Sequence, residues 1–235
     1  SNIMKHILLI LALFLLPLSL YSQGDSIYFS NAIKINFKKY KDASARAYRK
    51  GDMEKGKFLF DSLVKHRLEG TTFDDYTFKK FRGGKLKLAE VDKPVVIITY
   101  AAWCVPALGE IPAINKLAQQ YGKDVKFVVL FWNRRENMKK TARKFGSRIT
   151  VCYAHESYKN DAPIIASMKH TLGFPTSFYL DENLKVVDIR RDSKPVGPKK
   201  AYYKKGYALN YNSVVDGLGQ LLMNRQLAKE RLAGN

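Results

Sequence analysis

The chain has few of the residues that hold metals or phosphate groups. Its 235 residues include two cysteines and four histidines, and the histidines do not stand at metal-ligand spacing from cysteines or carboxylates. The sequence therefore predicts no metal site. A glycine-rich loop of the kind that cradles phosphates is also missing, so we expect no bound cofactor.

Acidic residues are scarce as well. The 21 Asp and Glu residues stand against 41 Lys and Arg, which gives a formal net charge of +20. Such a charge can attract nucleic acid, but the leader described next predicts export, and an exported protein rarely meets nucleic acid. We therefore expect no nucleic-acid partner. An anionic membrane surface, an acidic partner protein and a merely solvated basic surface remain as alternatives.

The N-terminal apolar run, from Ile7 to Leu18, is too short for a membrane span of ~20 residues and contains Pro17. A basic start before it and small residues near a cut after Ser22 are typical of a secretory signal peptide. Cleavage is favoured over an uncleaved anchor, and the lack of a cysteine near the cut excludes a lipid-anchored lipoprotein. We assign residues 1–22 to a tag scar and signal peptide, and we expect export to the periplasm or cell envelope.

The remaining chain holds enough apolar material for a packed core. Hydrophobic residues make up 46% of the sequence, with 13 Phe and 14 Tyr, which argues against global disorder. Over residues 30–69, apolar residues recur at helical spacing on both sides of a Gly-Asp turn. This pattern predicts an N-terminal helical hairpin, assigned to residues 23–70. Its second helix is expected to bury Phe58, Leu59, Leu63 and Val64.

From residue 71 onward, strand patterns alternate with helical ones. The order β-α-β-α-β-α-β-β-α predicts an α/β fold with helices on both faces of a mixed central sheet. We assign residues 71–235 to this domain. Pro112 lies inside the helix expected after the first central strand, where it predicts a kink or a restart.

A Lys/Tyr-rich insert covers residues 193–211 of that domain. It has five Lys, four Tyr and no acidic residue, and its Pro and Gly residues predict a loop or a short hairpin. Docking to an anionic membrane surface or to an acidic partner is one interpretation. A solvated loop is the other.

The segment WCVP places Cys104 where a buried apolar run ends and a helix is expected to begin. Helix N-terminal amides stabilise an anion, so we expect the pKa of the Cys104 thiol to lie below its free value of ~8.5. Pro106 suits a first helical turn, and Trp103 is expected to shield one side of the sulfur. An inert, half-buried cysteine is the alternative interpretation.

The segment GFPTSFYL supplies a second signal. Pro175 follows a helix that ends at Gly173-Phe174 and precedes a strand. A proline at the first position of a strand is permitted and often marks a special turn, of which a cis peptide bond between Phe174 and Pro175 is one form.

Together with the lead-in TFDDYTFKKFRGGKLKLAEVDKPVVIITYAAWC, these segments resemble the TlpA-type thioredoxin-like disulfide reductases of the bacterial envelope. The resemblance covers about residues 71–190 and the last helix. It implies a thioredoxin-like fold and a Trp-Cys-x-x-Cys turn that faces a cis-proline loop. Cys104 then corresponds to the attacking thiol, and Trp103 and Pro106 match the motif. Glu110 matches a glutamate that often follows it.

The same resemblance implies a substrate-binding loop. Pro175 corresponds to the cis-proline beside the sulfur, with Phe174 and Thr176 on either side, and a substrate chain would dock there by backbone pairing. Glu110 is left with two interpretations, a proton-transfer residue or an exposed helix residue without a role.

The chain departs from the family at Ala107, where the second, resolving cysteine normally stands. That thiolate would attack the mixed disulfide and release the product. An engineered Cys→Ala substitution and a natural monothiol variant both explain Ala107. Cys152 is expected inside a strand. A disulfide needs Cα atoms ~4.4–6.8 Å apart, and a strand interior seldom comes that close to a cysteine at a helix N-terminus. A buried structural cysteine is therefore favoured over a resolving cysteine.

These features predict an exported thiol–disulfide oxidoreductase that reduces protein disulfides. Its partners would be protein disulfide or thiol substrates and an upstream thiol reductant. The alternative is a non-catalytic thioredoxin-fold module that holds a partner peptide at the cis-proline groove. Peroxide chemistry through a Cys104 sulfenate is a third hypothesis, which the absence of a Thr-x-x-Cys turn weakens.

Overall fold

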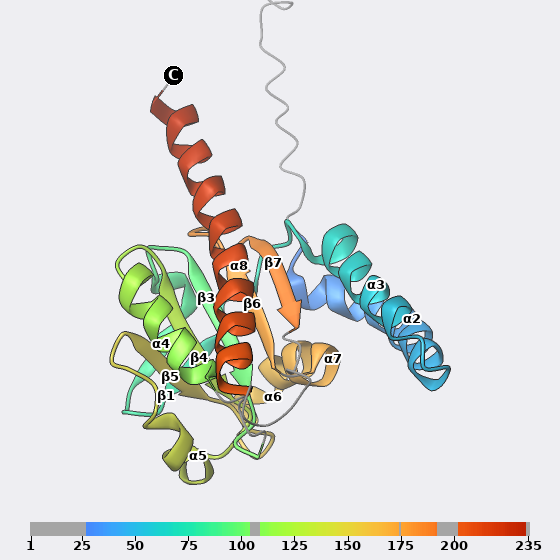
Figure 1. Ribbon diagram of the computed structural model, residues 1–235, viewed down its shortest axis with the longest axis horizontal. Coiled ribbons are helices and arrows are strands. Elements are labelled where there is room, and N and C mark those ends of the chain that lie inside the picture. The colour runs from blue at the N-terminus through green and yellow to red at the C-terminus, as the bar shows by residue number, and fades with distance from the viewer. Residues whose placement is uncertain (1–26, 104–108, 174, 192–201, 234–235) are drawn as a thin grey trace, which may run out of the picture.

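The fold is built on one seven-stranded sheet. The computed structural model describes residues 27–103, 109–173, 175–191 and 202–233 (Figure 1). Within them the strand order is β2-β1-β5-β4-β3-β6-β7. The strands are β1 (Thr77–Lys80), β2 (Lys85–Lys87), β3 (Val95–Tyr100), β4 (Lys126–Phe131), β5 (Ile149–Tyr153), β6 (Thr176–Leu180) and β7 (Val186–Arg191).

The centre of the sheet is parallel and the two ends are antiparallel. Strands β3, β4 and β5 run parallel, while β6 pairs with β3, and β1 with β5, in the antiparallel sense. All six residues of β3 are buried, as expected for a continuous apolar run with helices on both faces. The carboxyl ends of β3, β4 and β5 therefore meet at one edge of the sheet.

Helices cover both faces, which confirms the predicted fold class. Residues of α4, α5 and α8 pack in one core cluster, and residues of α2, α3 and α6–α7 pack in the other. The elements are α2 (Phe29–Arg49), α3 (Met53–Leu63), the π-helical turn η1 (Val64–Leu68), the 3₁₀ turn η2 (Leu88–Glu90), α4 (Glu110–Tyr121), α5 (Arg135–Ala142), the 3₁₀ turn η3 (Lys159–Asp161), α6 (Ala162–Ile164), the π-helical turn η4 (Ile165–Lys169), α7 (His170–Leu172) and α8 (Tyr202–Ala233).

The predicted N-terminal hairpin is confirmed as α2 and α3, but one face of its second helix was predicted wrongly. Leu63 and Val64 are buried as expected, whereas Phe58 is 69% exposed and Phe60 is buried in its place. The reason is packing. Phe60 lies under Tyr40 of α2, with ring centroids 6.4 Å apart, and Phe58 lies about 200° around the helix from it.

The hairpin shares its core with the sheet. Phe29 is fully buried, and its ring lies 5.0 Å from that of Phe73 and 5.9 Å from that of Phe178 on β6. The backbone nitrogen of Phe29 also donates to the carbonyl of Thr72. Helices α2 and α3 are thus joined to the sheet through one hydrophobic cluster.

Pro112 does not kink a helix. Helix α4 begins at Glu110, after Gly109 in a left-handed conformation, so Pro112 lies in the first turn. The backbone amides of a first turn have no intrahelical acceptor, and a missing amide hydrogen costs nothing there. Of the two expectations for Pro112, the kink is wrong, and a helix start just before the proline is what the structure has.

The expected loop or hairpin over 193–211 is wrong for its second half. Residues from Tyr202 onward form the first turns of α8, a helix of 32 residues. Figure 1 shows α8 lying alongside α4, with its C-terminal end projecting beyond the sheet. Among the helices of the described residues, α8 included, none is both long and apolar enough to cross a membrane.

Candidate active site

The pairing of β3 with β6 brings together the two segments predicted to form the site, the one that follows β3 and the one around Pro175. The Thr99 hydroxyl donates to the carbonyl of Thr176 and accepts from its backbone N–H, both at 3.1 Å. Both threonines are fully buried. Because the strands are antiparallel, the end of β3 that leads to Trp103 lies beside the start of β6, where Pro175 stands.

Hydrogen bonds from the Thr176 side chain to the backbone before Pro175 stabilise the turn around this proline. The Thr176 hydroxyl lies 3.2 Å from the carbonyl of Gly173 and 3.4 Å from that of Leu172, and it donates toward both. Gly173 has φ 74° and ψ −158°, a conformation essentially confined to glycine. Thr176 was predicted to bind substrate. Its side chain is fully buried and supports the Pro175 turn from inside the fold. Substrate docking at this turn by backbone pairing stays a prediction. Phe174 lies outside the described residues.

Glu110 is not an exposed helix residue, so that interpretation is wrong. Its side chain is 4% exposed, and the Tyr100 hydroxyl donates a hydrogen bond to its Oε1. Tyr100 is the last residue of β3 and Glu110 the first of α4. The pair therefore ties together the two ends of the segment that contains the predicted redox turn.

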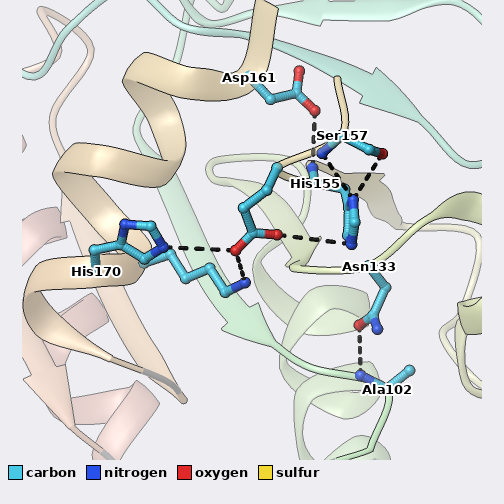
Figure 2. A network of polar contacts seen from close by, with 8 residues as sticks. Ala102, Asn133, His155, Ser157, Asp161 and His170 are labelled. Atoms are coloured by element: carbon cyan, nitrogen blue, oxygen red, sulfur yellow. Dashed lines mark hydrogen bonds and ion pairs between the residues drawn. The ribbon is translucent and has the colours of Figure 1, made fainter. Parts of the chain in front are cut away.

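The exit from β3 is fixed by a neighbouring strand. The backbone N–H of Ala102 donates to Oδ1 of Asn133 at 2.6 Å, just after β4 ends (Figure 2). The next residue, Trp103, is 72% exposed. Cys104, Pro106 and Ala107 lie outside the described residues.

Cys152 is a buried residue of β5. Its register partner on β4 is Leu130, whose own partner on β3 is Thr99. Two strand spacings separate Cys152 from β3, about 10 Å, which exceeds the Cα separation of a disulfide. Burial raises the pKa of the Cys152 thiol to about 12. This places Cys152 inside the sheet, as expected for a structural cysteine.

Charged side chains gather just after β5, at the same edge of the sheet as Asn133. Glu156 lies between Lys169 and two histidines, His155 and His170, which Figure 2 labels. Lys169 donates to its Oε1, and the Nε2 atoms of His155 and His170 lie 3.7 and 3.6 Å from its carboxylate oxygens. Across the described ranges, no three His, Cys, Asp or Glu residues form a group able to hold a metal ion.

Asp161 anchors this cluster to the sheet. Its Oδ2 accepts from the backbone N–H of His155 at 2.9 Å, and its Oδ1 accepts from Lys79 of β1. The Asp161 side chain is 4% exposed. The hydrogen bonds and the ion pair compensate the cost of burying a carboxylate, and they fix the position of His155 at the end of β5.

The ion pair of Glu156 with Lys169 predicts how the stability of the fold depends on pH. Hydrogen bonding from Lys169 lowers the pKa of Glu156 to about 2. Because the folded pKa lies below the unfolded one, the ion pair stabilises the fold above pH ~4.3, and this contribution disappears as the pH falls to about 2. Glu156 is 42% exposed, so we expect only about 0.5 kcal/mol.

Titration of the Glu156 carboxyl by NMR checks this prediction. Lys169→Met should return the midpoint toward ~4.3, whereas Lys140→Met, which removes the same charge from an exposed site on α5, should leave it unchanged. An identical midpoint in the parent and Lys169→Met proteins would contradict the assignment.

Three residues that build the site were not predicted from the sequence. Thr99 and Tyr100 interrupt the apolar run of β3, and Asn133 is the first polar residue after the run of β4. A polar side chain at the carboxyl end of a central buried strand is the signal that identifies them, since such ends line the site edge of α/β sheets.

The sequence matches a known family over its central half. The profile of the AhpC/TSA family matches residues 70–189, which spans the end of the hairpin, β1 to β7 and the helices between them. A similar curated protein is the thioredoxin-like protein YneN of Bacillus subtilis (strain 168). It is 27% identical over 128 residues, which are 52% of this chain and 70% of that protein.

Solved structures give more distant likenesses. The thioredoxin domain of a thiol-disulfide oxidoreductase from Bacteroides vulgatus has a TM-score of 0.47 and 18% identity, covering 63% of this chain and 96% of that one. A secreted Mycobacterium tuberculosis disulfide oxidoreductase has a TM-score of 0.42 and 15% identity, covering 57% and 96%.

Proposed function

The chain belongs to the AhpC/TSA family, and we propose that it is an exported thiol–disulfide oxidoreductase whose attacking group is the Cys104 thiolate. The observation that carries the proposal is the pair of hydrogen bonds between Thr99 and Thr176. They hold the strand that leads to Cys104 beside the strand that begins after Pro175, so a thiol and a substrate-docking turn would share one edge of the sheet.

The proposed reaction is thiol–disulfide exchange. The Cys104 thiolate attacks one sulfur of a protein disulfide, a new S–S bond forms, and the other substrate sulfur leaves as a thiolate. Helix α4 begins at Glu110, after Cys104 in the sequence, and we propose that the turn between them brings the thiolate to the positive end of this helix, which would stabilise it. We assign proton transfer to Glu110, whose carboxyl is buried and hydrogen-bonded to Tyr100.

The second half of the reaction needs an external thiol. Ala107 has no sulfur to attack the mixed disulfide, so the bond between Cys104 and the substrate would persist until a thiol reductant cleaves it. The proposed partners are therefore protein disulfides and an upstream thiol reductant. The signal-peptide pattern of residues 1–22 supports a periplasmic or envelope location.

The domain assignment is part of this proposal. We propose that the scar and leader end at residue 22, and that residues 23–70 and 71–235 form one folding unit. The hydrophobic cluster around Phe29, Phe73 and Phe178 supports this unit, because it draws on both segments. The substrate turn at Pro175 and the hairpin then belong to the same rigid body.

Selective alkylation tests the proposed nucleophile. Cys104 is expected to react with iodoacetamide at neutral pH, with a midpoint below the free value of ~8.5, because its thiolate is stabilised. Cys152 is the internal control, since its buried thiol has a pKa of about 12 and should stay unmodified in the folded protein. Mass spectrometry of the peptides that contain Cys104 and Cys152, after alkylation at a series of pH values, measures the modified fraction of each cysteine.

Two outcomes would count against a catalytic cysteine. One is a Cys104 midpoint equal to that of a free thiol, and the other is slower modification of Cys104 than of Cys152. A non-catalytic module that holds a peptide at the Pro175 groove would then be favoured. Ala107 is the observation that supports this second candidate function, because a binding module needs no resolving thiol.

A further inference from the structure

The first turns of α8 lie against the segment that carries the proposed redox turn. Gly109, two residues after Ala107 and just before α4, has φ +92°. A Cβ atom at Gly109 would lie 2.4 Å from the carbonyl oxygen of Tyr203 and 2.8 Å from the backbone nitrogen of Tyr207. Only a glycine allows such close backbone contact, so α8 begins directly beside one end of the turn.

A row of tyrosines continues from this contact along α8. Tyr203, Tyr207 and Tyr211 follow one another at intervals of four residues, which places them on one side of the helix. Their rings are stacked, with centroids 6.4 and 5.8 Å apart. The Tyr211 hydroxyl donates to Gln120 of α4 at 3.0 Å, which fixes the row relative to α4.

The surface formed by these turns is aromatic and basic. Tyr203 is 50% exposed, Lys204 and Lys205 are exposed, and the first turn of α8 holds no acidic residue. Trp103, at the other end of the redox turn, is 72% exposed. Tyrosine and tryptophan are enriched in surfaces that bind another protein. A patch that carries positive charges and no negative ones favours a partner of negative charge.

We infer that the surface of Tyr203, Lys204 and Lys205 docks an acidic stretch of the disulfide-bearing protein on which Cys104 acts. Charge complementarity selects this occupant, because Lys204 and Lys205 are exposed there and residues 202–215 contain no Asp or Glu. The place of the surface favours a protein substrate over a membrane, since it adjoins the turn where the disulfide must arrive. The inference rests on the proposed function and adds the substrate class.

The experiment uses the chain with Ala107, which should hold its mixed disulfide. Three disulfide-bonded peptides of equal length carry Asp and Glu, Ser, or Lys on both sides of the cystine. A small uncharged dipyridyl disulfide reports on Cys104 alone. We expect mixed-disulfide formation with the acidic peptide to be about fivefold to tenfold faster than with the basic one, and 0.5 M NaCl should reduce this preference.

Two charge reversals separate local docking from general attraction. Lys204→Glu should remove most of the preference for the acidic peptide. Lys229→Glu makes the same change in net charge on an exposed site of the same helix, about 37 Å away along its axis, and should keep the preference. Tyr203→Ser should slow all three peptides by a similar factor, because the ring contacts a peptide whatever its charge.

The outcomes distinguish the two proposals. Equal rates for the acidic and basic peptides, with normal reaction of dipyridyl disulfide, would overturn the docking surface and leave the proposed function standing. An equal loss of preference in Lys204→Glu and Lys229→Glu would also overturn it, since the field of the whole protein would then explain the effect. No reaction with any disulfide would overturn the proposed function, and the docking surface with it.

Discussion

Ala107→Cys is expected to replace the slow release of the mixed disulfide by an external thiol with a fast release by a thiol of the chain itself. With a thiol reductant present, the multiple-turnover rate of protein-disulfide reduction should rise by about 100-fold or more. The reason is that a neighbouring thiolate replaces a bimolecular release step with an intramolecular one, and well-placed intramolecular groups act at very high effective concentrations. Insulin precipitation or the release of thiols from a peptide disulfide measures the rate.

Matched variants identify the sulfur as the cause. Ala107→Ser has nearly the same size as Ala107→Cys without a thiol, so it should remain at the parent rate. Cys104→Ser, alone or together with Ala107→Cys, should abolish the reaction and the trapped mixed disulfide. If Ala107→Cys reduces no protein or small-molecule disulfide, the oxidoreductase proposal fails and the binding-module alternative is favoured.

Phe29→Ala is expected to be the most destabilising of the changes considered. Phe29 is fully buried between the rings of Phe73 and Phe178, and removing a buried phenylalanine costs about 3–5 kcal/mol through lost contacts and a residual cavity. In a chain of this size, that corresponds to a fall in melting temperature of roughly 10 °C. Urea unfolding followed by circular dichroism measures the change in the free energy of unfolding.

The hairpin supplies its own control for this prediction. Phe58→Ala removes the same side chain from α3, but Phe58 is 69% exposed, so the free energy of unfolding should change by no more than about 0.5 kcal/mol. Equal effects of Phe29→Ala and Phe58→Ala would show that the hairpin is not part of the shared core. Two separate unfolding transitions in the parent chain would argue the same.

The fold was predictable because its strands and helices have strong patterns. The run VVIITY can bury all its side chains only in a central strand, and the helices between such runs require a layered sheet. The positions of Pro175 and Cys152 followed from those strands. The hydrogen bonds of Thr99 with Thr176 did not, because they join residues 77 positions apart in sequence, a pairing set by tertiary register rather than by local pattern.

The start of α8 was missed for a different reason. Tyr and Lys give only weak helical periodicity there, and the Pro and Gly residues before Tyr202 indicate a loop. The contact of Tyr203 and Tyr207 with Gly109 adds tertiary packing to a marginal local preference. Glu110 shows the same limit, since a glutamate at a helix start is usually solvated, and its pairing with Tyr100 is a tertiary contact that the local sequence does not predict.

The two outer strands of the sheet also bear on aggregation. A free strand edge is a template for pairing with a second copy, and short length and lysines are known defences. Strand β2 has three residues, of which Lys85 and Lys87 are exposed. At the opposite edge, Val186 at the start of β7 exchanges backbone hydrogen bonds with Gly70 and Thr71. Both borders thus discourage edge-to-edge polymerisation, which should keep separate copies of the chain from pairing strand to strand at high local concentration.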